Sequence, residues 1–184
     1  MHGSRHGFRH GFKHGFTLVE MMVVIVIVAI LSAVSMPSFR ALAQTYPAQA
    51  LASSFRAALE YARAEAIKQG IPVTLCVSSN GATCNGSTAW QNGWIIFADA
   101  NADKTVGALL QWQKALAGTD TMVADNSVSA LSFSRDGFVI ALPGSGDVTF
   151  TIHSTPANSS ATRCVAVTKT GHLVTQRAGT GACA

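Results

Sequence analysis

Charged residues are scarce in this chain. They make up 12% of its 184 residues, and alanine, glycine, serine and threonine fill much of the remainder. No cysteine pair has the C-x-x-C spacing of zinc sites, and the two histidines beyond residue 15, His153 and His172, lie in no nucleophile-elbow or metal motif. The sequence therefore predicts no enzyme, no metal site and no cofactor. Its small polar residues are typical of secreted and filament-forming proteins.

Excess positive charge is confined to the first 15 residues. The chain carries 13 basic and 9 acidic residues, and Arg5, Arg9 and Lys13 account for three of the basic ones. Beyond residue 15 the two signs nearly balance, so the net charge of +4 is a weak argument for nucleic-acid binding. Because these cations precede an apolar run, we expect a cytoplasmic N-terminus and an exported remainder.

The apolar run covers residues 16–36, and Glu20 is its only charged residue. At about 1.5 Å per residue, a helix of this length matches the hydrocarbon core of a bilayer. A carboxylate inside a membrane span costs about 2.5–3.5 kcal/mol on insertion scales, so it requires a partner. Cleavage after Gly15 would create one, because the α-amino group of Phe16 would begin the helix. Glu20 of one subunit would then neutralise the Phe16 amine of the next.

This N-terminal stretch resembles the class III signal of type IV prepilins and type II secretion pseudopilins. The matching residues are Gly15 before the cleavage site, Phe16 after it, and Glu20 and Pro37 in the mature chain. The resemblance implies that a prepilin peptidase cleaves after Gly15 and N-methylates Phe16. It also implies anchoring in the inner membrane and assembly with other pilin or pseudopilin subunits, in which Glu20 and Pro37 take part.

An ordinary secretory signal is the alternative interpretation of the same stretch. In that case Ala41-Leu42-Ala43 would be the cleavage site, and a soluble periplasmic protein would begin at Gln44. The 16 apolar residues from Met21 to Met36 exceed a usual signal-peptide core, and a glutamate at its edge has no role there.

Beyond the apolar run the pattern becomes amphipathic. Apolar residues recur at helical spacing from Phe39 through Tyr46 to Ala66, Pro37 predicts a kink, and Gly70 ends the helix. Short strands follow, interrupted by a polar loop over 78–92. They are expected at 71–77, 93–98, 109–116, 128–134, 138–142, 148–153, 164–168 and 172–176.

The predicted fold is therefore α+β, with a long N-terminal helix packed against a small antiparallel β domain. Four segments are expected: a leader over 1–15, a membrane or filament-core half of the helix over 16–36, an amphipathic half over 37–69, and a β-rich domain over 70–184.

The β-rich part resembles the GspH/FimT family of minor pilins and pseudopilins. The resemblance rests on the strand with Cys76, the loop with Cys84, the late strand after Gly171, and the block Trp90-x-x-Gly93-Trp94-Ile95-Ile96-Phe97-x-Asp99-x-Asn101-x-Asp103. It implies a single-pass subunit whose globular domain is periplasmic and joins a type IV pilus or a type II secretion pseudopilus. The choice between these two machines stays open.

The four cysteines all lie in the part expected to be exported, which predicts two disulfides. Of the three connectivities, Cys76–Cys84 and Cys164–Cys183 are favoured, because each pair brackets a stretch rich in glycine, asparagine, serine and threonine. A zinc site is the rival, and the missing C-x-x-C spacing argues against it.

One weaker pattern concerns calcium. Asp99-x-Asn101-x-Asp103 begins like a calcium-binding loop but lacks the glycine and the closing glutamate of such loops, which favours an ordinary turn.

Some FimT-type pilins bind DNA through Gly-Arg-x-Arg in a late turn, but the residues after Gly171 here are His-Leu-Val. Lys169, Arg177 and Arg163 would still allow weak, non-specific phosphate contacts, so a DNA-binding minor pilin that acts in DNA uptake is the alternative function. A solvated hairpin edge is the favoured interpretation.

Overall fold

The computed structural model describes residues 15–116, 118–140 and 147–183, with the backbone alone at 37, 38 and 40–44. It divides into two units, Met1–Arg40 and Ala41–Ala184, and helix α1, Leu18–Gln69, contributes to both. The expected leader falls almost wholly outside the described residues. The helix assignment continues through Pro37, whose predicted kink stays a prediction.

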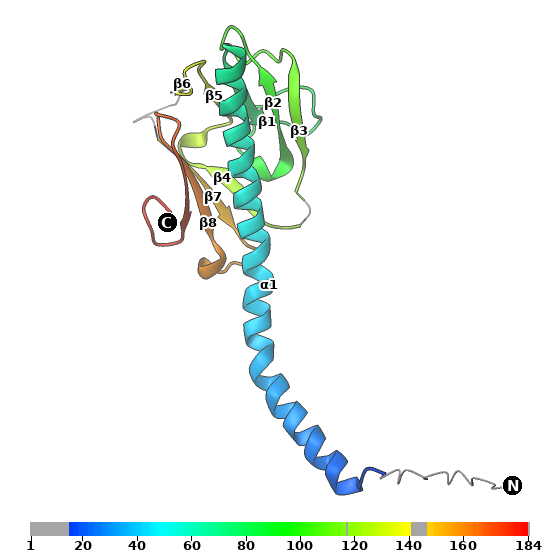
Figure 1. Ribbon diagram of the computed structural model, residues 1–184. Helices are drawn as coiled ribbons and strands as arrows, with labels where there is room; N and C mark the ends of the chain where they lie inside the picture. The colour runs from blue at the N-terminus through cyan, green and yellow to red at the C-terminus, as the bar shows by residue number, and fades with distance from the viewer. Residues whose placement is uncertain (1–14, 117, 141–146, 184) are drawn as a thin grey trace, which may run out of the picture. The chain divides into compact units, whose positions relative to one another are not determined.

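The second unit contains two antiparallel sheets (Figure 1). A short 3₁₀ turn, Asp125–Ser127, lies on the connection from β4 in one sheet to β5 in the other. The first has the order β3-β2-β1-β5-β6, and the second has the order β4-β7-β8-β9. Their bounds are β1 Val73–Val77, β2 Gly93–Ala98, β3 Leu109–Lys114, β4 Thr121–Ala124, β5 Ala130–Phe133, β6 Val139–Ile140, β7 Val148–His153, β8 Arg163–Val167 and β9 Leu173–Arg177. The α+β prediction is confirmed, and β4 is a strand that the sequence analysis did not predict.

A stripe of small side chains on α1 forms the helical side of the core. The buried positions recur at alternating spacings of four and three residues, as expected for one helix face. Alanine dominates this face, so the helix backbone approaches both sheets closely, as Figure 1 shows for the C-terminal half of α1. The stripe comprises Ala48, Ala52, Phe55, Leu59, Ala62 and Ala66.

Phe55 is the largest side chain of this stripe and joins α1 to both sheets. Its ring lies 5.1 Å from that of Trp94 in the first sheet and 4.7 Å from that of Phe150 in the second. Trp90 packs edge-on against Phe150 and donates its indole N–H to the carbonyl of Val128 at 2.9 Å. The polar loop expected over 78–92 therefore ends in a buried tryptophan, a correction to the sequence analysis.

The predicted apolar face of α1 begins later than expected. Phe39 is 73% exposed and Tyr46 is 65% exposed, whereas Ala48 and the stripe beyond it are fully buried. Among the described side chains of the second unit, the buried face of the helix thus starts at Ala48.

Candidate functional site

The N-terminal part of α1 is apolar and exposed on all sides. Leu18–Met36 has a mean hydropathy of 2.7, and none of it is buried in the chain. Its valine, isoleucine, leucine and methionine side chains are between 46% and 77% exposed. A helix that is apolar all round requires an apolar environment, either lipid or other helices.

The polar side chains of this segment are satisfied locally. The hydroxyl of Ser32 donates to the carbonyl of Val28 at 2.7 Å, and that of Ser35 donates to Leu31 at 2.8 Å. Such bonds to the preceding turn let serine sit in an apolar helix without an external partner. Glu20 is consequently the one residue of Leu18–Met36 whose charge needs compensation from outside the helix.

Glu20 takes part in a capping box at the start of α1. The backbone N–H of Glu20 donates to the hydroxyl of Thr17 at 3.2 Å, and the N–H of Thr17 donates to the Glu20 carboxylate at 3.4 Å. This reciprocal pair occupies two N–H groups that a helix start leaves unbonded. The sequence analysis missed it, although Thr17-x-x-Glu20 before an apolar run is its recognised pattern.

The residues expected at the cleavage site precede the helix. Gly15 and Phe16 have no helical assignment, Phe16 is 77% exposed, and nothing lies within 4 Å of a Cβ built on Gly15. The chain that follows is helical without interruption, so Ala41–Ala43 lies inside α1. Non-helical, exposed backbone is therefore present at Gly15 and Phe16, whereas the backbone at 41–43 is helical.

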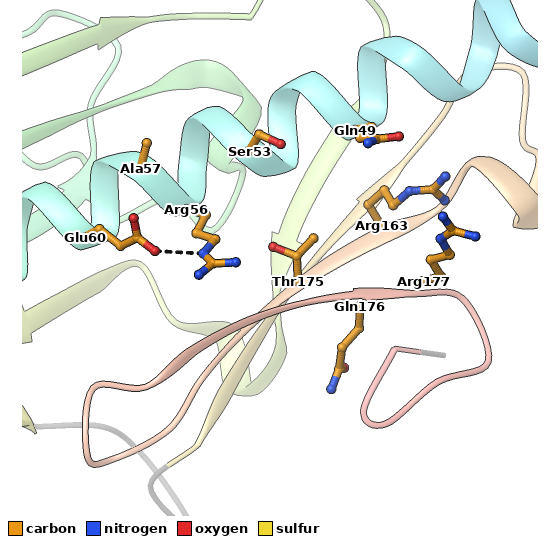
Figure 2. Close-up of a pocket in the computed structure, with 9 residues that line it drawn as sticks. All are labelled: Gln49, Ser53, Arg56, Ala57, Glu60, Arg163, Thr175, Gln176 and Arg177. Carbon is orange, nitrogen blue, oxygen red and sulfur yellow. Dashed lines mark hydrogen bonds and ion pairs between the residues drawn. The ribbon is translucent and has the colours of Figure 1, made fainter.

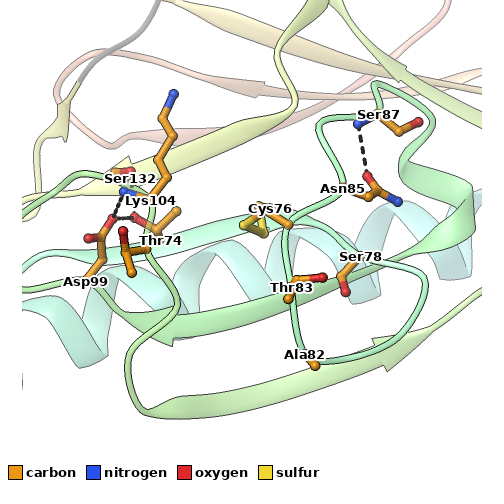
Figure 3. Close-up of a disulfide and its surroundings, with 12 residues drawn as sticks. Thr74, Cys76, Ser78, Ala82, Thr83, Asn85, Ser87, Asp99, Lys104 and Ser132 are labelled. Carbon is orange, nitrogen blue, oxygen red and sulfur yellow. Dashed lines mark hydrogen bonds between the residues drawn. A yellow bond between two sulfur atoms is a disulfide. The ribbon is translucent and has the colours of Figure 1, made fainter.

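The β domain contains two disulfides, at the pairs that the sequence analysis favoured. Cys76 is bonded to Cys84 across eight residues, and Cys164 to Cys183 across nineteen. The first closes the loop after β1 over the sheet face that points away from α1 (Figure 3). On that face Cys76 packs with Ile95. β1 is therefore covered on both faces.

Asp99 also organises a loop on this outer face. Its carboxylate accepts the hydroxyl of Thr74 at 2.7 Å and the backbone N–H groups of Asp103 and Lys104 at 3.1 and 3.0 Å (Figure 3). Asp99 is 2% exposed, so its oxygens are used within the protein. A hydrogen bond from Thr105 lowers the pKa of the exposed Asp103 carboxyl. Within residues 15–116, 118–140 and 147–183, no three metal-ligating side chains gather.

The residues expected to contact DNA phosphates do not form one surface. Arg163 and Arg177 lie directly opposite each other at one end of the β8–β9 hairpin. Lys169 lies in the turn at the other end, where its N–H donates to Asp147 at 3.1 Å. Arg163 is 5% exposed, whereas Lys169 and Arg177 are exposed side chains. DNA binding stays a prediction. His153 and His172 are exposed side chains.

Comparison with known families decides the class. The model of a family described as type II transport protein GspH matches residues 51–171, and a prokaryotic N-terminal methylation motif matches residues 12–36. The chain belongs to the GspH family. The match to GspH begins in the buried half of α1 and ends at Gly171, and the methylation motif covers the cleavage site and the apolar segment.

Solved structures share the fold of this GspH family member. Two crystal forms of the type IV minor pilin FimU from Pseudomonas aeruginosa have TM-scores of 0.56 and 0.57 and 22% identity. They cover 70% of this chain and 91% and 87% of their own. The minor pseudopilin EpsH of the type 2 secretion system of Vibrio cholerae has a TM-score of 0.48 and 17% identity, covering 71% of this chain and 96% of its own. No curated protein matches.

These findings confirm the predicted class, a minor pilin or pseudopilin subunit with a pilin-like fold. GspH family members of this kind are structural subunits, and the apolar helix with its methylation motif makes the chain a membrane-anchored one.

Proposed function

We propose that the mature chain is anchored in the inner membrane by Leu18–Met36 and assembles with other pilin or pseudopilin subunits into a periplasmic filament. The observation that carries this proposal is an apolar helix with no buried residue in a chain of the GspH family. The filament is a type IV pilus or a type II secretion pseudopilus, since the same subunit plan serves both. Its work is assembly and display of the β domain.

The anchor is suited to both environments that the subunit would meet. At about 1.5 Å per residue its 19 residues span about 28 Å, close to the hydrocarbon thickness of a bilayer. The basic leader before it favours a cytoplasmic N-terminus. In a filament the same side chains would pack against neighbouring helices, which keeps them out of water as the lipid does.

A prepilin peptidase would process the chain between Gly15 and Phe16. The non-helical backbone at these residues supports access to this bond, and the helical backbone at 41–43 argues against a second site there. We expect the protein from membranes to begin at N-methylated Phe16. Intact mass spectrometry measures this directly, and a mass beginning at Met1 or Gln44 would contradict the proposal.

The Glu20 carboxylate would neutralise the Phe16 amine of the next subunit. Two variants separate this role from helix capping, because glutamine keeps the capping box and loses the charge, whereas alanine loses both. We expect Glu20→Gln and Glu20→Ala to insert in the membrane at least as well as the unchanged chain. Both should be depleted from sheared filaments, since an unpaired buried amine costs about 3–5 kcal/mol.

The measurement is immunoblotting of membrane and sheared filament fractions from cells that express each variant. Ser32→Ala is the matched control, because it changes a locally bonded polar side chain of the same segment and should assemble normally. Normal assembly of Glu20→Gln alongside failure of Glu20→Ala would assign Glu20 to capping and refute the charge pairing.

A further inference from the structure

A polar pocket of about 360 Å³ lies between α1 and the β8–β9 hairpin, within the second unit. That volume falls in the range of small-molecule sites, about 300–1,000 Å³. Among the described residues its lining holds three arginines and one glutamate. The helix contributes Gln49, Ser53, Arg56 and Glu60, and the hairpin contributes Arg163 and Arg177 (Figure 2).

Two of these arginines are held together by the strand register. Arg163 on β8 is the cross-strand partner of Arg177 on β9, so their side chains share one sheet face. Figure 2 shows both guanidinium groups at the same end of the pocket. Like charges directly opposite on a sheet destabilise the pairing. Consistently, burial and the charge of Arg177 lower the pKa of the Arg163 guanidinium.

Hydrogen bonds hold the Arg163 side chain in place without neutralising its positive charge. One terminal nitrogen of Arg163, Nη1, donates to the carbonyls of Ser160 and Thr162, both at 2.8 Å. These acceptors are neutral, and neither Arg163 nor Arg177 forms an ion pair within the described part of the chain. The other N–H groups of Arg163 and the whole guanidinium of Arg177 thus remain free to bind an anion.

The helix side of the pocket supplies a third cation and short polar groups. Arg56 donates from Nε to Glu60 at 2.8 Å, which leaves its terminal nitrogens available. Ser53 and Gln49 stand one and two turns before it along α1, and Figure 2 shows their polar atoms on the same side of the helix. Cations and neutral donors therefore line the pocket from two elements, with Arg56 beside Glu60 and the two hairpin arginines at the other end (Figure 2).

We propose that this pocket binds an oxyanion, specifically a phosphate group, between Arg163, Arg177 and the exposed face of α1. Guanidinium forks match phosphate oxygens two at a time, and charge-assisted bonds of this kind are about twice as strong as neutral ones. The bound anion would compensate the facing arginines, which otherwise oppose each other across the hairpin. This role is separate from filament assembly, because the residues involved lie outside the apolar segment.

The test is isothermal titration of the full chain, in a nonionic detergent, with inorganic phosphate at ionic strength held constant by sodium chloride. We expect saturable binding that Arg177→Gln weakens by at least about tenfold, the cost of losing charge-assisted hydrogen bonds. Glu60→Gln should tighten binding, because it removes the one carboxylate of the lining and frees Arg56. Both side chains are exposed, so neither variant should unfold the domain.

Arg135→Gln is the matched control, since Arg135 is an exposed arginine in the β5–β6 turn that does not line the pocket. Its phosphate affinity should equal that of the unchanged chain. No saturable binding at tens of millimolar phosphate would overturn the proposal, as would equal losses for Arg177→Gln and Arg135→Gln.

The source of the phosphate is distinguished by a second titrant. Dimethyl phosphate carries one charge and two free oxygens, like the diesters of nucleic acids and lipids. We expect it to bind more weakly than inorganic phosphate, because two facing guanidinium groups favour a dianion with several free oxygens. Equal affinity for both titrants would still place an oxyanion in the pocket and would assign it to a diester ligand.

Discussion

Replacement of Gly171 by alanine should destabilise the β domain far more than replacement of a comparable glycine. Gly171 lies in the β8–β9 turn with φ of +77°, and a Cβ there would collide with the carbonyl oxygen of Gly137 and lie 2.9 Å from Nε of Arg63. Arg63 reaches from α1 and donates to that same carbonyl at 3.0 Å. The three residues form a contact between the helix and one turn of each sheet.

The expected loss has two parts. A left-handed conformation costs alanine about 1–2 kcal/mol, and loss of the charged hydrogen bond from Arg63 to Gly137 costs about 1.5–3 kcal/mol. Together they lower the free energy of unfolding by about 2.5–5 kcal/mol. Gly179 is the matched control, because its φ of +75° is nearly the same and nothing lies within 4 Å of its Cβ position. Gly179→Ala should therefore lower the free energy of unfolding only by the cost of the left-handed conformation, about 1–2 kcal/mol.

Thermal unfolding of the full chain in nonionic detergent measures both variants. For a domain of this size each kcal/mol lowers Tm by about 3 °C, which gives a drop of about 10 °C for Gly171→Ala and about 4 °C for Gly179→Ala. Arg63→Gln should cost little more once Gly171→Ala is present, because both changes break the same contact. Equal drops for the two glycines would show that conformation alone matters and would refute the close approach to Gly137.

Two further outcomes test the outer face of the β domain. Replacing both cysteines of a pair with serine should lower the free energy of unfolding by about 2.5 kcal/mol for Cys76–Cys84 and about 3 kcal/mol for Cys164–Cys183. These are the values that the chain-entropy model gives for loops of this length. Peptide mapping without reductant checks the pairing, and a Cys76–Cys164 peptide would contradict it. Asp99→Ala should lower the free energy of unfolding, measured in urea, by about 2–3 kcal/mol, because it leaves buried donors unpaired. Added calcium should not change the Tm of the unchanged chain. A calcium-dependent rise in Tm would restore the interpretation of this loop as a metal site.

The sequence predicted the parts of this fold that depend on local pattern. The span over 16–36 and the strong β1 and β2 strands follow from hydrophobicity and period, which need no knowledge of neighbours. β4 was missed because its four residues, Thr121–Ala124, are half exposed and carry little apolar signal. Trp90 was assigned to a polar loop because its burial depends on Phe55 and Phe150, which are distant in sequence.

The candidate functional residues also fall into those that a local sequence pattern predicts and those that depend on contacts distant in sequence. Gly15, Phe16 and Glu20 form a linear motif, so their relation is visible without a structure. Arg163 and Arg177 were predicted as scattered surface cations, because only the hairpin register places them opposite each other. That they line one pocket with Arg56 depends, in addition, on the packing of α1 beside the β8–β9 hairpin.

The two halves of α1 carry separate tasks, and their composition explains how one helix can serve both. The first half is rich in valine, isoleucine and methionine, which make lipid-facing or helix-facing surface in every direction. The second half narrows its buried face to alanines around Phe55, so the β domain contacts only one side of the helix. If the second half were also apolar on all sides, the helix face that carries Ser53 and Arg56 would be apolar and covered. A narrow alanine stripe therefore holds the domain on the helix and leaves the adjacent polar stripe open to a ligand.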